Sequence, residues 1–202
     1  MTALFTTSDT PPALAPDSLT RLGAIVLATD LTLERDLAQL LPAHVALHVA
    51  RIDFNNPTTP ENLRAMAPDL SQAASLLVPG VDLAAVGFGC TSGAVVIGDA
   101  RIAGAVGAVR PGVPVTTPAM AALAALARLR AQRVAILTPY LAETSAPVLD
   151  YFTQAGLDVV RAHGLGLADD RDIARIAPDA IRDAVAQADH PQAEALFISC
   201  TA

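Results

Sequence analysis

Short apolar runs alternate with segments of helical periodicity along most of the chain, and this pattern predicts alternating strands and helices. Residues such as Pro42, Gly80 and Gly156 mark the ends of predicted helices. The predicted strands are 22–28, 45–49, 83–88, 113–116, 133–138, 157–161 and 195–199. The predicted helices are 34–41, 61–77, 118–130, 142–155 and 173–188, and a further helix runs from after Gly93 to about Val109. Residues 163–170 are a predicted loop.

The order of these elements repeats once along the chain. Ile25 corresponds to Ile136. Cys90, which follows the predicted strand 83–88, corresponds to Cys200, which follows the predicted strand 195–199. Alternating strands and helices form mainly parallel sheets flanked by helices, so we expect an α/β fold of two similar lobes related by a pseudo-twofold axis. The expected division is a flexible lead-in over 1–20, a first lobe over 21–117 and a second lobe over 118–202. The first copy continues well past its cysteine, so we expect the second lobe to be truncated at its C-terminal end.

Composition narrows the class of protein. The 202 residues are 52% hydrophobic and only 3% aromatic, which is typical of helices packed on buried parallel sheets. No apolar run is long enough to span a bilayer and no export signal is visible, so the prediction is a cytoplasmic protein without a membrane partner. A net charge of -7 and scattered arginines argue against nucleic acid as a partner. Homo-oligomerisation is left open.

Candidate chemistry lies at the carboxyl ends of the strands, where ligands bind in open α/β sheets. Cys90 and Cys200 both follow such ends, and hydroxyl residues follow each of them. The helix after Cys90 predicts a lowered thiol pKa and a larger thiolate fraction. Inverting a carbon beside a carboxylate needs a base on one face and an acid on the other, which two facing thiols provide. Thr91, Ser92 and Thr201 are predicted to hold the carboxylate.

Asp30 and Tyr140 follow the first strand of each copy and are therefore predicted to line the same cleft and bind substrate. Helix N-capping is the alternative for Asp30, and simple packing is the alternative for Tyr140. Arg51, Asn55 and Asn56 leave the second strand and are expected in a solvated loop, with the rim of the cleft as the alternative. The histidines form no metal-ligand spacing with the cysteines, so neither a metal nor an organic cofactor is predicted.

Three motifs in order resemble one known group of enzymes: Gly89-Cys90-Thr91-Ser92-Gly93, Leu137-Thr138-Pro139-Tyr140 and Ile198-Ser199-Cys200-Thr201. From about Leu22 to the chain end, the sequence resembles the aspartate/glutamate racemase superfamily, in the branch of maleate cis-trans isomerase and arylmalonate decarboxylase. The racemases of that superfamily use a cysteine pair as acid and base. The maleate isomerase resemblance implies that Cys90 adds to a double bond, that Cys200 assists as an acid, and that Tyr140 contacts the substrate carboxylate.

One departure from the maleate isomerase pattern concerns the substrate. Maleate isomerases carry Pro-Ser-Ser-Asn-Thr-Thr-x-Glu after the first strand, and this chain has Asp30 in place of the asparagine. A carboxylate there disfavours a substrate carboxylate and suits an ammonium or amide N–H group. The Ala-Thr-Asp segment and the Ser-Cys-Thr-Ala ending resemble the ectoine-utilisation members of the branch, which implies an amino-acid-like substrate from ectoine or hydroxyectoine breakdown.

The sequence therefore predicts a cofactor-independent isomerase or racemase that acts on a small carboxylate or amino-acid-like substrate. An arylmalonate-type decarboxylase is one alternative, because it needs only one protonating cysteine and an apolar pocket for the departing carboxylate. A non-catalytic protein that binds a small carboxylate is the other.

Overall fold

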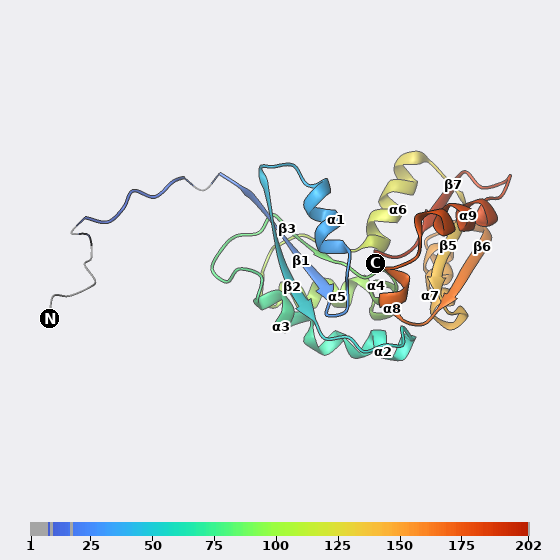
Figure 1. The fold of residues 1–202 in the computed structure, drawn as a ribbon, viewed down its shortest axis with the longest axis horizontal. Helices are drawn as coiled ribbons and strands as arrows, with labels where there is room; N and C mark the ends of the chain where they lie inside the picture. The colour runs from blue at the N-terminus through green and yellow to red at the C-terminus, as the bar shows by residue number, and fades with distance from the viewer. Residues whose placement is uncertain (1–7, 9, 17, 202) are drawn as a thin grey trace.

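The computed structural model describes residues 8, 10–16 and 18–201. It contains two lobes, each with a parallel sheet flanked by helices, as predicted (Figure 1). The first sheet has the order β2-β1-β3-β4 and the second has the order β6-β5-β7. The strands are β1 (Thr20–Leu27), β2 (Val45–Ile52), β3 (Ala85–Phe88), β4 (Val115–Thr116), β5 (Arg133–Tyr140), β6 (Asp158–Leu167) and β7 (Ala195–Ile198).

Three predicted helices are each divided into shorter ones. Pro68 cannot donate a helical hydrogen bond, Gly98 has a φ of 95°, and Pro178 fits only the first turn of a new helix. The helices are α1 (Leu33–Leu40), α2 (Pro60–Ala65), the 3-10 turn η1 (Ala67–Asp69), α3 (Leu70–Ser75), α4 (Thr91–Ile97), α5 (Asp99–Gly107), α6 (Pro118–Leu129), α7 (Ala142–Gln154), α8 (Asp170–Ile173) and α9 (Pro178–Ala188). Among the described residues, no helix is long and apolar enough to cross a membrane.

In both sheets an equivalent backbone hydrogen bond holds the residue before the cysteine to the central strand. The backbone N–H of Gly89 donates to the carbonyl of Ile25 in β1 at 2.8 Å. The N–H of Ser199 donates to the carbonyl of Leu137 in β5, also at 2.8 Å. Each donor immediately precedes a cysteine in the chain, and β1 and β5 are the corresponding central strands of the two sheets. This equivalence supports an internal duplication.

The predicted loop over 163–170 is wrong in its first half, because β6 continues to Leu167. His163 and Gly164 pair with Leu137 and Thr138 of β5, and the register shifts farther along the strand. The glycines suggested a loop, but Gly164 pairs with Thr138 of β5, and Gly166, with a φ of 73°, lies where the register shifts. Of the predicted lead-in over 1–20, residues 1–7, 9 and 17 lie outside the described residues, and 10–16 form neither helix nor strand.

Hydrogen bonds join the lobes close to the ends of their strands. The N–H of Thr58 donates to the carbonyl of Ala168 at 2.7 Å, and the hydroxyl of Thr144 in α7 donates to the carbonyl of Thr58 at 2.7 Å. Both Thr58 and Thr144 are buried. The loop after β2 is thereby held against the second lobe, and this brings the strand ends of both sheets to one place.

Candidate active site

A cavity of about 20 Å³, room for about one water molecule, lies where the strands of both lobes end. It gathers every residue that the sequence analysis selected for the site: Asp30, Cys90, Thr91, Ser92, Tyr140, Cys200 and Thr201. Its other lining residues were not selected, and they are Leu27, Thr58, Gly89, Asp170 and Ile173. The predicted residues therefore share one location, and their chemical roles stay predictions.

Cys90 lies between β3 and α4 and caps that helix with its sulfur. Its Sγ accepts the N–H of Gly93 at 3.3 Å and lies 3.8 Å from the hydroxyl oxygen of Ser92. Burial raises the pKa of the Cys90 thiol to about 12, against the lowering effect of the Gly93 N–H, and the nearby Cys200 raises it further. The predicted lowering of this pKa is therefore wrong, because loss of water outweighs one backbone donor at a seven-residue helix.

Cys200 follows β7 and approaches the cavity with a different backbone shape. Its φ is 103°, a region that residues with a side chain rarely adopt, whereas the φ of Cys90 is -143°. Such a backbone persists where surrounding contacts hold it. The next residue supplies two of them, because the hydroxyl of Thr201 donates to the carbonyl of Gly89 at 2.9 Å and its carbonyl accepts the hydroxyl of Thr32 at 3.1 Å. The two cysteine segments are thereby joined directly.

Tyr140 ends β5 and is almost fully buried. Its phenol oxygen accepts the hydroxyl of Ser199 at 3.3 Å. Burial raises the pKa of Tyr140 well above its usual value, and the charges of Cys200 and Cys90 raise it further. The phenol therefore stays protonated and can donate a hydrogen bond to a bound anion.

Asp30 lies at the cavity and also accepts backbone hydrogen bonds at the start of α1, while its role in substrate binding stays a prediction. One oxygen of its carboxylate accepts the N–H groups of Thr32 at 3.0 Å and Leu33 at 2.8 Å, which caps the start of α1. The same side chain is 5% exposed and lines the cavity. Arg51, expected in a loop, lies in β2, and its guanidinium donates at 3.0 to 3.2 Å to three carbonyls of the loop that carries Asp30, those of Leu27, Ala28 and Asp30 itself.

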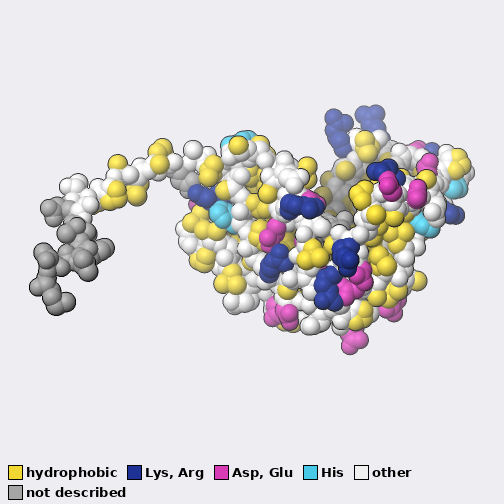
Figure 2. All heavy atoms as spheres, in the orientation of Figure 1, with side chains coloured by type: hydrophobic (Ala, Val, Ile, Leu, Met, Phe, Trp, Pro, Cys, Tyr) yellow, Lys and Arg dark blue, Asp and Glu magenta, His cyan; other side chains and the backbone are white. Residues whose placement is uncertain are grey.

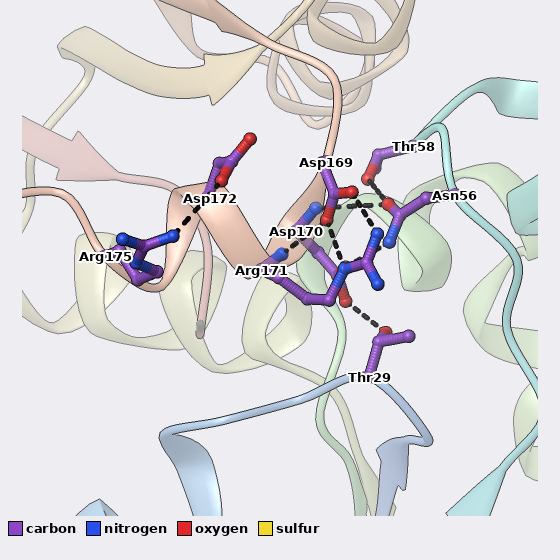
Figure 3. Close-up of polar contacts among 8 residues, drawn as sticks. All are labelled: Thr29, Asn56, Thr58, Asp169, Asp170, Arg171, Asp172 and Arg175. Carbon is purple, nitrogen blue, oxygen red and sulfur yellow. Dashed lines mark hydrogen bonds and ion pairs between the residues drawn. The ribbon is translucent and has the colours of Figure 1, made fainter.

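Asp170 is the principal residue that the sequence analysis missed. It begins α8 and is 5% exposed, and its carboxylate accepts hydrogen bonds from the Thr29 hydroxyl and, at 2.6 Å, from the Asn56 amide (Figure 3). The backbone N–H of Asp170 donates to Asn56 Oδ1 at 3.1 Å. Asn56, expected to be solvated, is instead half-buried and hydrogen-bonded to the other lobe. One signal could have found the pair, because Asn56 and Asp170 follow the second strand of each copy.

None of the described residues that line the cavity is Lys, Arg or His, so each of them is negatively charged or neutral. Figure 2 shows the basic side chains of the viewed face in small separate groups beside acidic ones, without a continuous basic stripe. Within the described part of the chain, no group of three or more His, Cys, Asp and Glu side chains is arranged to hold a metal ion.

Known proteins show the same fold and related sequences. The family model described as arylmalonate decarboxylase matches residues 99–202. The maleate isomerase of Alcaligenes faecalis is 24% identical over 89% of this chain and 76% of its own length. A mutant of the Nocardia farcinica maleate cis-trans isomerase with a covalently bound succinylcysteine intermediate has a TM-score of 0.79 at 23% identity, over 90% of this chain and 78% of that one. A liganded double mutant of arylmalonate decarboxylase has a TM-score of 0.78 at 25% identity, over 89% and 77%.

Proposed function

Because this chain belongs to the arylmalonate decarboxylase family, whose model its residues 99–202 match, we propose that it is an isomerase that acts on a small carboxylate through Cys90 and Cys200. The observation that carries this proposal is the meeting of the two thiols, one from the equivalent strand end of each lobe, in a single cavity. The similarity to maleate isomerases supports an isomerisation.

The two thiols supply an acid and a base without any net change in protons. In a racemisation, the thiolate of one cysteine removes the proton from the carbon beside the carboxylate, and the opposite thiol adds a proton to the other face. The two cysteines then have exchanged protonation states, and a second turnover in the reverse direction restores them. Hydroxyl donors, including the protonated Tyr140, hold the carboxylate as it gains enolate charge.

A cis-trans isomerisation uses the same pair in different roles. The thiolate of Cys90 forms a bond to one alkene carbon, and the proton of Cys200 goes to the other, which leaves a single bond that can rotate and Cys200 as the thiolate. Return of that proton to Cys200 and release of the Cys90 sulfur then restore the double bond. The covalent succinylcysteine of the Nocardia farcinica enzyme supports this route for a related protein.

We also propose that the substrate comes from ectoine or hydroxyectoine breakdown. The support is the likeness of the Ala28-Thr29-Asp30 segment and the Ser-Cys-Thr-Ala ending to the ectoine-utilisation members of the branch. Asp30 lines the cavity, so its carboxylate lies where it could meet a donor group of such a substrate.

A decarboxylase is a second candidate, and one cavity favours it. An apolar pocket of about 180 Å³ adjoins the site and shares Ile173 and Cys200 with it. Leu137, Ile176 and Ile198 also line this pocket. A departing carboxylate loses its charge as carbon dioxide forms, so an apolar wall beside the protonating thiol favours that step.

Proton exchange in deuterated water separates these functions. The wild-type chain is incubated with amino acids, maleate and an arylmalonate, while NMR follows deuterium uptake and isomerisation, and released carbon dioxide is measured. We expect exchange or isomerisation that both Cys90→Ser and Cys200→Ser abolish, with unchanged far-UV circular dichroism. Carbon dioxide release that survives in one of these variants would instead establish the decarboxylase. Ligand binding without turnover of any substrate would refute both the isomerase and the decarboxylase proposals and would indicate a non-catalytic binding protein.

A further inference from the structure

The cavity places two buried carboxyl groups beside the two thiols. Asp30 and Asp170 are each 5% exposed and both line the cavity. The carboxylate of Asp30 already accepts two backbone N–H groups. Asp170 receives its hydrogen bonds from neutral groups, the hydroxyl of Thr29 and the amide of Asn56. The carboxylate of Asp170 is therefore satisfied by hydrogen bonds, but no described lining residue supplies a positive charge to balance it.

The neighbouring arginine is turned toward another carboxylate. Arg171 donates its Nε–H to Asp169 Oδ1 at 2.8 Å and forms an ion pair with the same side chain (Figure 3). The Arg171 side chain is 58% exposed, so water screens its interaction with Asp170. A ligand in the cavity consequently meets the carboxylate of Asp170 and the thiols without a compensating cation from the lining residues.

A plain dicarboxylate would bring two more negative charges into this buried place, which is costly without a cation. An ammonium group beside the carboxylate supplies both the opposite charge and N–H donors, and charge-assisted hydrogen bonds of this kind are strong. We infer that Asp170 is the specificity-determining residue of the site and that it selects a zwitterionic, amino-acid-like substrate by binding its ammonium group. This inference rests on the proposed function, which makes the same cavity the place of reaction.

The electrostatics of Cys90 agree with this assignment. The negative charge of Asp170 is among the causes that raise the Cys90 pKa, after burial and the neighbouring Cys200. An ammonium group bound between them acts in the opposite direction and favours the thiolate. Cys90 would thus gain nucleophilic or basic character when its substrate arrives.

Paired ligands test the selection directly. Aspartate and succinate share one carbon skeleton and differ only in the ammonium group, as do glutamate and glutarate. Calorimetric titration of the intact chain should give at least tenfold tighter binding of the ammonium-bearing member of a pair. Asp170→Asn should lose most of this preference, and Asp170→Glu, which keeps the charge, should retain part of it. The matched control is Asp172→Asn, which removes an equal charge two residues away from a largely exposed side chain.

The inference is overturned if wild-type protein binds succinate and glutarate as tightly as their amino counterparts, if it binds no member of either pair, or if Asp170→Asn leaves the preference unchanged. The wild-type ratio decides the question even if a variant does not fold. Failure of the proposed function looks different, because the protein would then prefer the amino ligands but would neither exchange their α-proton nor isomerise them. If the protein instead turns over substrates that lack an ammonium group, and Asp170→Asn does not alter that turnover, the isomerase proposal stands and the inference about Asp170 is wrong.

Discussion

Asn56 and Asp170 exchange two hydrogen bonds across the two lobes. The amide of Asn56 donates to the Asp170 carboxylate at 2.6 Å, and its oxygen accepts the backbone N–H of Asp170 at 3.1 Å. Asparagine suits this position because it offers a donor and an acceptor together. The pair therefore joins Asp170, which lines the cavity, to the loop after β2 in the other lobe.

Asn56→Asp should destabilise the protein at neutral pH. The substitution replaces the donating amide by an oxygen and sets a second carboxylate against Asp170, so we expect a loss of about 1–3 kcal/mol in the free energy of unfolding. Urea denaturation measures it. Asn55→Asp is the control, since Asn55 is exposed, and it should change stability by less than about 0.5 kcal/mol. Equal effects of the two substitutions would show that the cross-lobe pair contributes nothing.

Gly93→Ala should displace the Cys90 thiol. A Cβ atom at this position would lie 2.9 Å from Met66 Cε and 3.0 Å from Cys90 Sγ. We expect at least a tenfold fall in isomerase turnover and a loss of about 1–3 kcal/mol in stability from overpacking. Gly104→Ala is the matched control within α5, where a Cβ atom meets nothing within 4 Å, and it should increase stability by about 0.5–1 kcal/mol. Normal turnover by Gly93→Ala would argue against a fixed position for the sulfur.

Tyr140→Phe should lower turnover, whereas Tyr151→Phe should lower stability and leave turnover unchanged. Removing the Tyr140 hydroxyl deletes a donor in the cavity, so turnover should fall by at least about tenfold. Removing the Tyr151 hydroxyl deletes its 2.7 Å hydrogen bond to Asp99, so we expect a stability loss of about 1–2 kcal/mol with turnover unchanged. Steady-state kinetics and thermal denaturation of both variants measure these effects. A Tyr140→Phe enzyme with wild-type turnover would assign that side chain to packing alone.

Alkylation of Cys90 should depend steeply on pH in the absence of substrate. The thiolate is the reactive form, and the pKa of Cys90 is raised to about 12. Below that pKa the thiolate fraction rises with pH, so the rate with iodoacetamide should increase about tenfold per pH unit, without a plateau, from about pH 7.5 to about pH 9.5. Peptide mass spectrometry follows Cys90 separately from Cys200. A plateau at about pH 8 would mean that burial does not control this thiol.

Strand ends and the repeat could be predicted from the sequence because local patterns determine them. The apolar runs before Cys90 and Cys200 placed both thiols, and the repeat paired them, as the equivalent hydrogen bonds from Gly89 and Ser199 now show. The helix divisions at Gly98 and Pro178 were not predicted, because each predicted helix was drawn as one continuous segment across them. The positive φ of Gly98 ends α4, and Pro178, which lacks an N–H, fits only the start of a new helix.

The hydrogen bonds of Asp170 and the state of Cys90 could not be predicted, because both depend on contacts between distant segments. The two side-chain partners of Asp170 lie 141 and 114 positions away in the sequence, at Thr29 and Asn56. The depth of burial that raises the Cys90 pKa arises only when both lobes close around it. A local signal, the helix after Cys90, pointed to the opposite shift.

The cavity of about 20 Å³ has a kinetic consequence, because a molecule much larger than water can enter only after the walls separate. Those walls are joined across the lobes by the hydrogen bonds of Asn56 with Asp170 and of Thr201 with Gly89. Binding of a larger ligand beside both thiols therefore requires these walls to move first. The observed association rate should level off at high ligand concentration, and in rapid mixing that limit reports how often the walls open.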